Sequence, residues 1–290
     1  MKPTLLFLSL LLCCVSAIAA PVAWVEAVQM PAWLKRTGVR QPLAVGMELR
    51  NNDEIRTGAN ARALLRMGDG SRVKLGENAE LKLDNLPEKL DLSKVFTATL
   101  DVLAGAFRFT TQAAIKLRGE RDFKVKIYNV TAGIRGTDVW VKAAPDRDIL
   151  CLIEGEVSVS RGNDAPFTMK DPLTFYIVPK NAPPQAVAPV PQEQVQKWAQ
   201  ETEITKGQGA VRHDGKWKVN LLTVENQADA LTVYNRFSQN GYTVRIQPVT
   251  IQGQQRYTLR ITHLPSRIEA QALAAKLKGQ LGAEQPSVSR

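Results

Sequence analysis

The chain has 290 residues, of which 44% are hydrophobic and 23% are charged, and its formal net charge is +10. This length allows two folded domains, and the charge content excludes a protein built mainly of membrane-spanning helices. The positive charge favours association with anionic polymers or surfaces without selecting among them.

The first element in chain order is an export signal. Lys2 precedes an apolar run from Leu5 to Val15, and small residues follow at Ala17 and Ala19. This three-part pattern predicts a cleavable signal peptide over residues 1–19, cut before Ala20. The apolar run is short for a membrane span, so we expect no transmembrane segment in the mature chain.

Cysteine usage disfavours both disulfides and a thiol enzyme. Cys13 and Cys14 lie in the segment that would be removed, where they leave lipidation open, so the mature chain retains Cys151 alone. Cys151 lies in an apolar, strand-like run, where a buried thiol is more typical than a nucleophile. His213 and His263 stand in no recognisable partner motif. We therefore expect neither an intramolecular disulfide nor a cysteine hydrolase.

Residues 20–178 are predicted to form an all-β domain. Short segments with apolar residues at alternate positions follow one another, for example Arg72–Leu75 and Phe123–Ile127. A period of two is typical of half-buried strands. Turn signals such as Gly68-Asp69-Gly70 and Glu154-Gly155 separate the segments.

Four motifs in this region resemble, in order, the signature of a FecR domain. They are Gly46–Gly58, Asp69–Gly76, Ile134–Val139 and Leu152–Val157, and the resemblance covers roughly Glu26 to Val159. It implies a β-rich periplasmic module, best known from regulators that relay an outer-membrane signal to a sigma factor. The sequence shows neither the cytoplasmic anti-sigma segment nor the internal membrane span of those regulators, so a regulatory function in the periplasm is kept as an alternative.

Arg135 and Asp138, in the third motif, are candidates for an interaction site of this domain. The competing interpretation is structural, because Arg135-Gly136-Thr137 predicts a turn that leads into a strand. The acidic residues show no metal-like spacing, and the glycine clusters precede strands instead of helices, which disfavours a phosphate loop. We therefore expect no metal and no cofactor.

A linker is predicted over residues 179–215. Five prolines fall between Pro179 and Pro191, which favours a semi-extended spacer. Glu193–Thr205 can then form a short helix that presents Val195, Trp198 and Ile204. We expect Trp198 to dock on a neighbouring domain.

Residues 216–290 are predicted to form a basic α+β domain, with ten Lys and Arg against four Asp and Glu. Its pattern consists of two strand–helix–strand halves. The first comprises Trp217–Leu222, a helical segment containing Ala228, Leu231, Tyr234 and Phe237, and Tyr242–Ile246; the second comprises Tyr257–Ile261, Ser266–Leu277 and a short strand near Ser287. Helices on one face of such a sheet would leave its other face open for binding.

These two halves resemble a SPOR domain. The resemblance is carried by Trp217, Val219 and Leu221 around Asn220, by Ala228, Leu231 and Gly241, and by Tyr257–Ile261 with Ser266–Ala270. Members usually carry Gln at the place of Asn220 and Gly at those of Leu222 and Thr262. The resemblance implies a ferredoxin-like βαββαβ fold that binds septal peptidoglycan, especially glycan strands stripped of their stem peptides.

The open side of this sheet is here called the outward face. Strand alternation predicts which side chains lie on it, provided that the helix side is formed by Val219, Leu221, Leu259 and Ile261. The predicted members are Lys218, Asn220, Leu222, Arg245, Gln247, Thr258, Arg260 and Thr262. Amide and guanidinium groups suit the hydroxyls, acetamido groups and free lactyl carboxylates of a denuded glycan. A merely solvated face is the competing interpretation. Single-stranded RNA is disfavoured, because the signal peptide removes the chain from RNA and no aromatic pair is expected on this face.

The sequence thus predicts a non-catalytic periplasmic protein of the cell envelope that binds peptidoglycan, at division sites, through its C-terminal domain. The β domain would present a surface to another envelope or division protein or to a polymer. An accessory or wall-processing enzyme is the second alternative, although one thiol and two histidines assemble no catalytic constellation. No nucleic-acid partner is expected.

Overall fold

The computed structural model describes residues 21–91, 95–111, 121–134 and 136–290. The predicted signal peptide, with Cys13 and Cys14, and the candidate residue Arg135 therefore lie outside the described residues. Within the described ranges, no helix combines the length and apolar character needed to cross a membrane.

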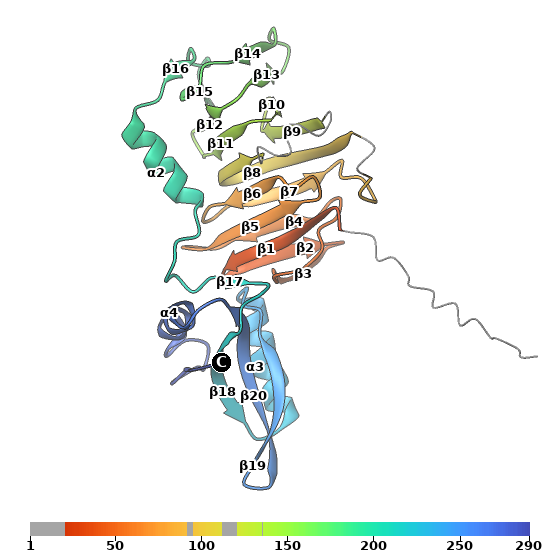
Figure 1. The fold of residues 1–290 in the computed structure, drawn as a ribbon, viewed down its shortest axis with the longest axis vertical. Coiled ribbons are helices and arrows are strands. Elements are labelled where there is room, and N and C mark those ends of the chain that lie inside the picture. Colours follow the sequence, from red (N-terminus) through yellow and green to blue (C-terminus); the bar gives the residue numbers. More distant parts are fainter. Residues whose placement is uncertain (1–20, 92–94, 112–120, 135) are drawn as a thin grey trace, which may run out of the picture.

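The N-terminal half forms a β-sandwich, as the alternating pattern predicts. Its 17 strands make one hydrogen-bonded network, arranged as two facing sheets whose strands follow one another along the long axis of the molecule (Figure 1). The core lies between the sheets and includes Leu65 and Val73 from one and Leu34, Ile55 and Leu81 from the other.

The first sheet runs in the spatial order β17-β1-β5-β6-β8-β11-β12-β15-β16. The bounds of its strands are β1 (Ala23–Gln29), β5 (Arg62–Met67), β6 (Arg72–Leu75), β8 (Phe96–Thr110), β11 (Asp138–Ala143), β12 (Arg147–Glu154), β15 (Thr174–Pro179), β16 (Ala188–Pro189) and β17 (Val211–Arg212).

The second sheet runs in the order β3-β2-β4-β7-β8-β9-β10-β13-β14. Its further strands are β2 (Ala32–Arg36), β3 (Val39–Pro42), β4 (Glu54–Thr57), β7 (Glu80–Asp84), β9 (Arg121–Ile127), β10 (Val130–Ile134), β13 (Val157–Arg161) and β14 (Phe167–Met169).

Strand β8 belongs to both sheets. Its first part pairs with β7 and β9, and its last part, from Gly105 to Thr110, pairs with β6 and β11. The strand passes from one sheet to the other at Gly105, whose φ of +86° is unfavourable for a residue with a side chain. A Cβ at this position would also lie only 2.6 Å from the Cα atom of Ala79.

Local sequence explains the individual strands. In β7, Leu81 and Leu83 are fully buried, and the polar residues between and beside them are half-buried. The Gly68-Asp69-Gly70 turn forms as predicted, because the Asp69 carboxylate accepts hydrogen bonds from the backbone N–H of Ser71 at 2.9 Å and from its hydroxyl at 2.7 Å.

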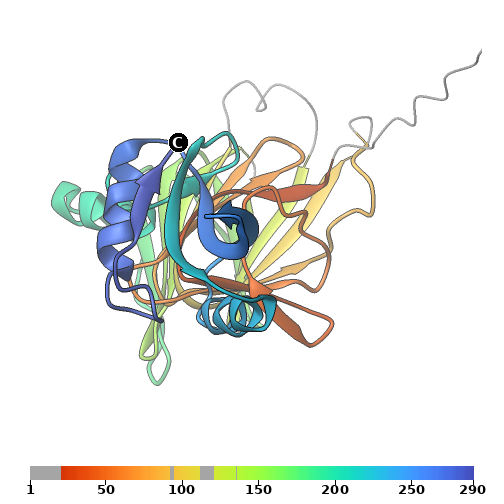
Figure 2. The same cartoon turned by 90° about the horizontal axis from the view of Figure 1, so that it is seen from below.

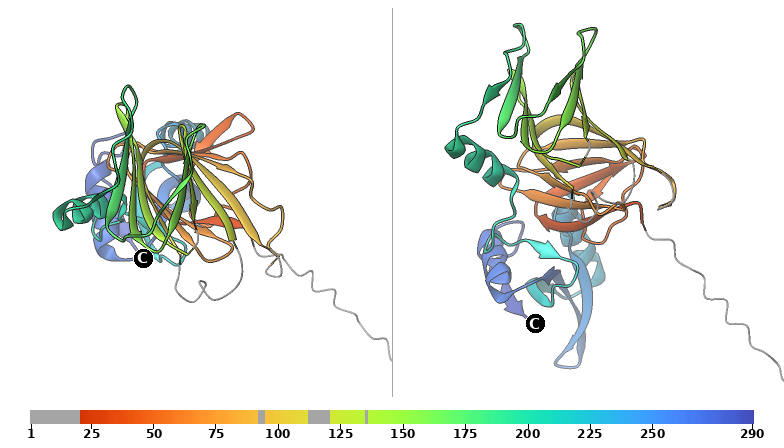
Figure 3. Two further views of the ribbon diagram at one scale, coloured as in Figure 1. Left: turned by 90° about the horizontal axis from the view of Figure 1, so that it is seen from above. Right: turned by 45° about the horizontal axis from the view of Figure 1, so that its top comes forward.

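The proline-rich segment is extended, but it is not a free spacer. Ala188 and Pro189 form β16 at the edge of the first sheet, where proline is tolerated because no further strand needs its missing N–H. Helix α2 (Gln192–Thr202) then runs along the side of the sandwich (Figures 1 and 3). Trp198 stacks on Trp140 with ring centroids 4.6 Å apart, so the predicted docking of Trp198 is confirmed.

The C-terminal domain has the predicted order of strands and helices. Its elements are β18 (Trp217–Val224), α3 (Gln227–Gln239), β19 (Arg245–Ile251), β20 (Gln254–Leu264), α4 (Arg267–Leu277) and β21 (Ser287–Ser289), and the sheet order is β19-β20-β18-β21. Asn226 and Ser266 cap the two helices by accepting hydrogen bonds from the N–H groups of Asp229 and Glu269.

Helix α3 differs from the sequence pattern in its rotation about its own axis. Ala230, Val233 and Phe237 are buried, whereas Leu231 and Tyr234 are 46% and 36% exposed. The spacing i, i+3, i+7 of the buried set places one stripe of the helix on the sheet. Leu231 and Tyr234 lie outside this stripe.

The two domains dock end to end, at the β1–β3 end of the sandwich, so that one overlaps the other when seen along the long axis (Figure 2). Strand β17 precedes the C-terminal domain and pairs with β1. Across the junction, the backbone N–H of Ala32 donates to the carbonyl of Gly241 at 3.1 Å, and the Lys276 ammonium donates to the carbonyl of Met30 at 2.8 Å. Burial at this contact lowers the pKa of Lys276.

Candidate functional site

The outward face of the C-terminal sheet is the side opposite α3 and α4. Val219, Leu259 and Ile261 point to the helices and are at most 1% exposed, together with Phe237 and Leu273. Because side chains alternate along a strand, the residues between these belong to the opposite side.

One lateral row of polar side chains crosses the outward face. Arg245 pairs with Arg260, Arg260 with Asn220, and Asn220 with Ser287 in the sheet register. The Arg260 guanidinium donates to Gln247 Oε1 at 2.7 Å, which fixes its position over the sheet. The four strands β19, β20, β18 and β21 thereby each contribute a hydrogen-bonding group to this row.

A second row lies next to the first. Gln247 pairs with Thr258, and Thr258 pairs with Thr223, whose hydroxyl lies 2.9 Å from that of Thr258. At the end of the face near the chain terminus, Lys218 pairs with Ser289 and donates to the carbonyl of Arg290 at 3.2 Å. The register thus brings together Lys218, Asn220, Arg245, Gln247, Thr258 and Arg260.

Leu222 does not lie on the outward face, and this part of the sequence interpretation was wrong. A β-bulge between Asn220 and Leu222 inserts an extra residue, so that Leu222 pairs with the fully buried Leu259. A bulge reverses the facing of every later residue in its strand. Leu222 packs against the core, and Thr223 takes the outward position.

The two arginines of this face have no carboxylate partner among the described residues. Arg245 and Arg260 lie directly opposite each other, an arrangement that destabilises a sheet through like-charge repulsion. Throughout the described ranges, neither arginine forms an ion pair with a carboxylate, and Arg260 Nε is buried without a hydrogen-bond partner. The arrangement is suited to an anionic, hydrogen-bonding ligand.

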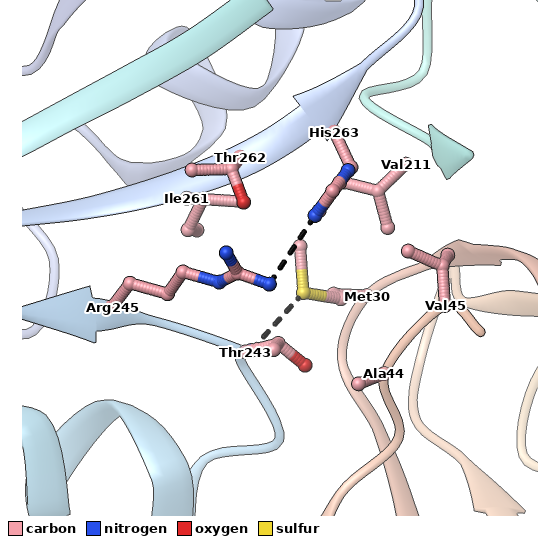
Figure 4. A pocket seen from close by; sticks show the side chains of 9 residues that line it. All are labelled: Met30, Ala44, Val45, Val211, Thr243, Arg245, Ile261, Thr262 and His263. Atoms are coloured by element: carbon pink, nitrogen blue, oxygen red, sulfur yellow. Dashed lines mark hydrogen bonds between the residues drawn. The ribbon is translucent and has the colours of Figure 1, made fainter. Parts of the chain in front are cut away.

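The outward face ends in a small cavity at the junction of the two domains (Figure 4). The cavity has a volume of about 40 Å³ and is bordered by Thr262, Arg245 and His263 on one side and by Met30 and Val45 on the other. Arg245 Nη2 lies 3.3 Å from His263 Nε2. Thr262 therefore borders the cavity instead of the two lateral rows.

Sequence reasoning missed the two histidines, which are distant from each other in the chain and belong to no motif. The rings of His213 and His263 stack with centroids 6.4 Å apart. The pKa of His263 is lowered, mainly because the ring is buried and also because of the charges of Arg245 and His213. A hydrogen bond with the backbone at His213 acts in the opposite direction. A local sequence pattern could not have predicted this pair, because the two histidines come together only in the folded chain.

The candidate interaction residue Asp138 forms a bidentate ion pair in the β-sandwich. Arg108 donates to its carboxylate from Nε at 2.9 Å and from Nη2 at 2.6 Å, and Asp138 is 8% exposed. Asp138 stabilises the pairing of β8 with β11, which agrees with the structural interpretation of its motif. Its role in an interaction stays a prediction.

Two protein-family models match separate segments of the chain. Residues 53–158 match the FecR protein family. Residues 214–290 match the SPOR domain family. The chain is a FecR domain protein with a C-terminal SPOR domain. SPOR membership suggests peptidoglycan binding, FecR membership suggests a regulatory role, and both are families of non-catalytic, envelope-associated domains.

Comparison with individual proteins adds little to this assignment. No curated protein matches the FecR–SPOR chain in sequence. Among solved structures, two crystal structures of a proposed anti-sigma factor from Parabacteroides distasonis resemble it with 13% identity and a TM-score of 0.41, over 78% of this chain and 90% of that one.

Proposed function

We propose that this protein binds the glycan strands of peptidoglycan through the outward face of its SPOR domain. The observation that carries the proposal is the row of Arg245, Arg260 and Asn220, in which two arginines lie side by side without a carboxylate partner in the described part of the chain. Guanidinium groups bind carboxylates strongly, and amides bind hydroxyl and acetamido groups.

The preferred ligand is a glycan strand without stem peptides, in the periplasm and at division sites. Removal of the peptides frees the lactyl carboxylates of the strand, which supply the negative charge that the arginine row lacks. The predicted signal peptide and the family assignments support the periplasmic location. The order of strands and helices in the SPOR domain supports the ferredoxin-like fold that the resemblance implies.

The FecR domain, in this proposal, presents a surface to another envelope or division protein or to a polymer. The FecR match also supports a second candidate function, that of a periplasmic regulator. Deletion of the gene, followed by a measurement of transcript levels, separates the two, because a regulator requires a transcriptional response that is lost with the protein.

Binding of the full chain without residues 1–19 to denuded strands tests the main proposal. Arg260→Ala should weaken binding about tenfold or more, because hydrogen bonds to charged groups contribute about 1.5–3 kcal/mol. Asn220→Ala should weaken it less, about fivefold, as expected for a neutral group at about 1 kcal/mol. Equilibrium binding to amidase-treated and untreated sacculi is the measurement.

Arg267→Ala is the matched control. It removes the same charge from the exposed start of α4, on the helix side of the sheet, and should leave the dissociation constant within about twofold. Failure of the unaltered protein to bind either preparation would sink the proposal. An equal loss of affinity in Arg260→Ala and Arg267→Ala would show that net charge alone drives the association.

A further inference from the structure

A cluster of three basic side chains lies where the outward face meets the FecR domain. Arg245 begins β19, His263 lies near the end of β20, and His213 follows β17. Arg245 Nη2 and His263 Nε2 are 3.3 Å apart, and the two imidazole rings stack at 6.4 Å. Three segments of the chain thus place side chains that can be positively charged close to one another.

The cavity beside this cluster is suited to a small charged group. Its volume of about 40 Å³ exceeds the roughly 10–15 Å³ that one water requires and is too small for a sugar ring. Met30, Ala44 and Val45 form its uncharged wall on the FecR side. An apolar wall strengthens the attraction between a cation and an anion because it excludes water.

The cluster lacks a counter-charge within the part of the chain that the structure describes. In the described segments, no carboxylate lies within ion-pair distance of Arg245, His213 or His263. The charged groups that act on His263 are Arg245 and His213, both of which oppose its protonation. His263 also has a φ of +68°. Such a backbone conformation is uncommon outside glycine and concentrates at functional sites.

We propose that Arg245, His263 and His213 form a subsite for a carboxylate of the glycan strand, namely the lactyl carboxylate of a muramic acid residue freed of its peptide. The subsite rests on the proposed function of the outward face and extends it to the domain junction. Sugar hydroxyls and acetamido groups would lie along the Asn220 and Arg260 row, while the carboxylate enters the cavity beside Arg245.

The FecR domain completes this subsite. A Cβ built on Gly46 would lie 3.0 Å from His213 Cδ2, so the imidazole rests against the backbone of the FecR domain. Gly46 has a φ of +76°, and its N–H donates to the carbonyl of Val25 at 2.8 Å. The docked FecR domain therefore positions a group that takes part in glycan binding.

The subsite couples binding to proton uptake. A bound carboxylate favours the imidazolium form of His263, which the free protein disfavours, so the complex holds more protons than its components. Affinity must then rise as pH falls. A strand carboxylate stays ionised at pH 5.5, because unperturbed carboxyl groups have pKa values of about 3.3–4.3.

The test compares the full chain without residues 1–19 with the double variant His213→Gln/His263→Asn at pH 7.5 and pH 5.5. Asparagine tolerates a positive φ, so the backbone at position 263 can persist. The unaltered protein should bind denuded strands about tenfold to a hundredfold more tightly at pH 5.5, because uptake of one full proton changes the affinity about tenfold per pH unit over these two units. The double variant should bind with an affinity that does not change with pH.

Chitin oligosaccharides are the matched ligand, since they offer the same hydroxyl and acetamido groups without a carboxylate. Their binding should not depend on pH in either protein. An equal pH dependence in the double variant, or the same dependence with chitin oligosaccharides, overturns the subsite while leaving the proposed function intact. Absence of strand binding at both pH values overturns the proposed function and the subsite with it.

Discussion

Burial controls the chemistry of Cys151. The thiol is fully buried in a small second core with Ala106, Trp140, Ile149 and Trp198. Desolvation, assisted by the charge of Asp138 and opposed by that of Arg108, raises the pKa of the thiol to about 12. The reactive thiolate is therefore scarce at neutral pH.

We expect Cys151 to resist thiol reagents in the folded protein. A pKa near 12 leaves roughly a three-thousandth of the thiolate of a free cysteine, whose pKa is about 8.5. Maleimide labelling of the chain without residues 1–19, followed by mass spectrometry, should show an unmodified native protein and complete labelling in concentrated urea. Labelling of the native protein within minutes would contradict the buried position.

His263 makes the free protein less stable as pH falls. Its folded-state pKa is lowered, so the unfolded chain binds more protons below about pH 6.5, and stability is lost as pH falls through the folded value. The free energy of unfolding of His263→Asn should change less between pH 7.5 and pH 5.5 than that of the unaltered protein. Urea titrations at the two pH values measure the difference; an identical pH dependence in the two proteins would contradict it.

At the scale of elements, helix α2 ties the linker to the sandwich. Trp198 stacks on Trp140 and meets Phe175 edge-on at 6.1 Å, and Glu201 accepts from Lys142 at 2.8 Å. Trp198 is 9% exposed. Trp198 is the one large buried side chain of α2, so the attachment of the helix to the sandwich depends on Trp198.

Trp198→Ala should destabilise the protein by about 3–5 kcal/mol, the usual cost of removing a buried aromatic side chain. Lys197→Ala, at an exposed neighbouring position that pairs with Glu193, should change stability by no more than about 0.5 kcal/mol. Urea unfolding of both variants provides the comparison. If Trp198→Ala costs no more than Lys197→Ala, the stacked pair does not anchor the helix.

The sequence predicted elements better than it predicted their irregularities. Alternation identified β18 and β20 and placed Asn220, Thr258 and Arg260 on one face, because a period of two is a property of the local chain. The bulge that turns Leu222 inward depends on how two strands fit together, and no residue in β18 signals it. The edge strand β16 was missed for a similar reason. Its pairing with β15 depends on the tertiary structure, whereas its prolines by themselves predict an extended spacer.

At the scale of the whole molecule, the FecR and SPOR domains share one continuous hydrophobic core, which includes Leu43 and Met30 from one and Tyr242 and Leu277 from the other. The junction joins residues that are about 200 positions apart, such as Thr243 and Leu43, whose hydroxyl and carbonyl lie 3.2 Å apart. Both domains could be predicted because their motifs are short, local sequence patterns. Contacts between residues so far apart produce no periodic pattern in the sequence. The histidine cluster could not be predicted for this reason.

Gly241→Ala should loosen the junction. A Cβ there would lie 2.7 Å from the Trp33 ring and 3.0 Å from the Ala32 nitrogen, whereas Gly253, with the same φ of +77°, has no atom within 4 Å. Gly253→Ala should therefore cost only the strain of a left-handed conformation, about 1–2 kcal/mol. Gly241→Ala should lower the melting temperature further and raise the radius of gyration in small-angle X-ray scattering. Equal behaviour of the two variants would contradict a rigid junction.

Strand β8 has a consequence for how the FecR domain can open. Because its first part belongs to one sheet and its last part to the other, neither sheet can separate locally while the other stays intact. Amides of β8 should accordingly exchange with deuterated solvent only through global unfolding, and they should report the full stability of the domain. A single fifteen-residue strand thus makes the two layers one cooperative folding unit.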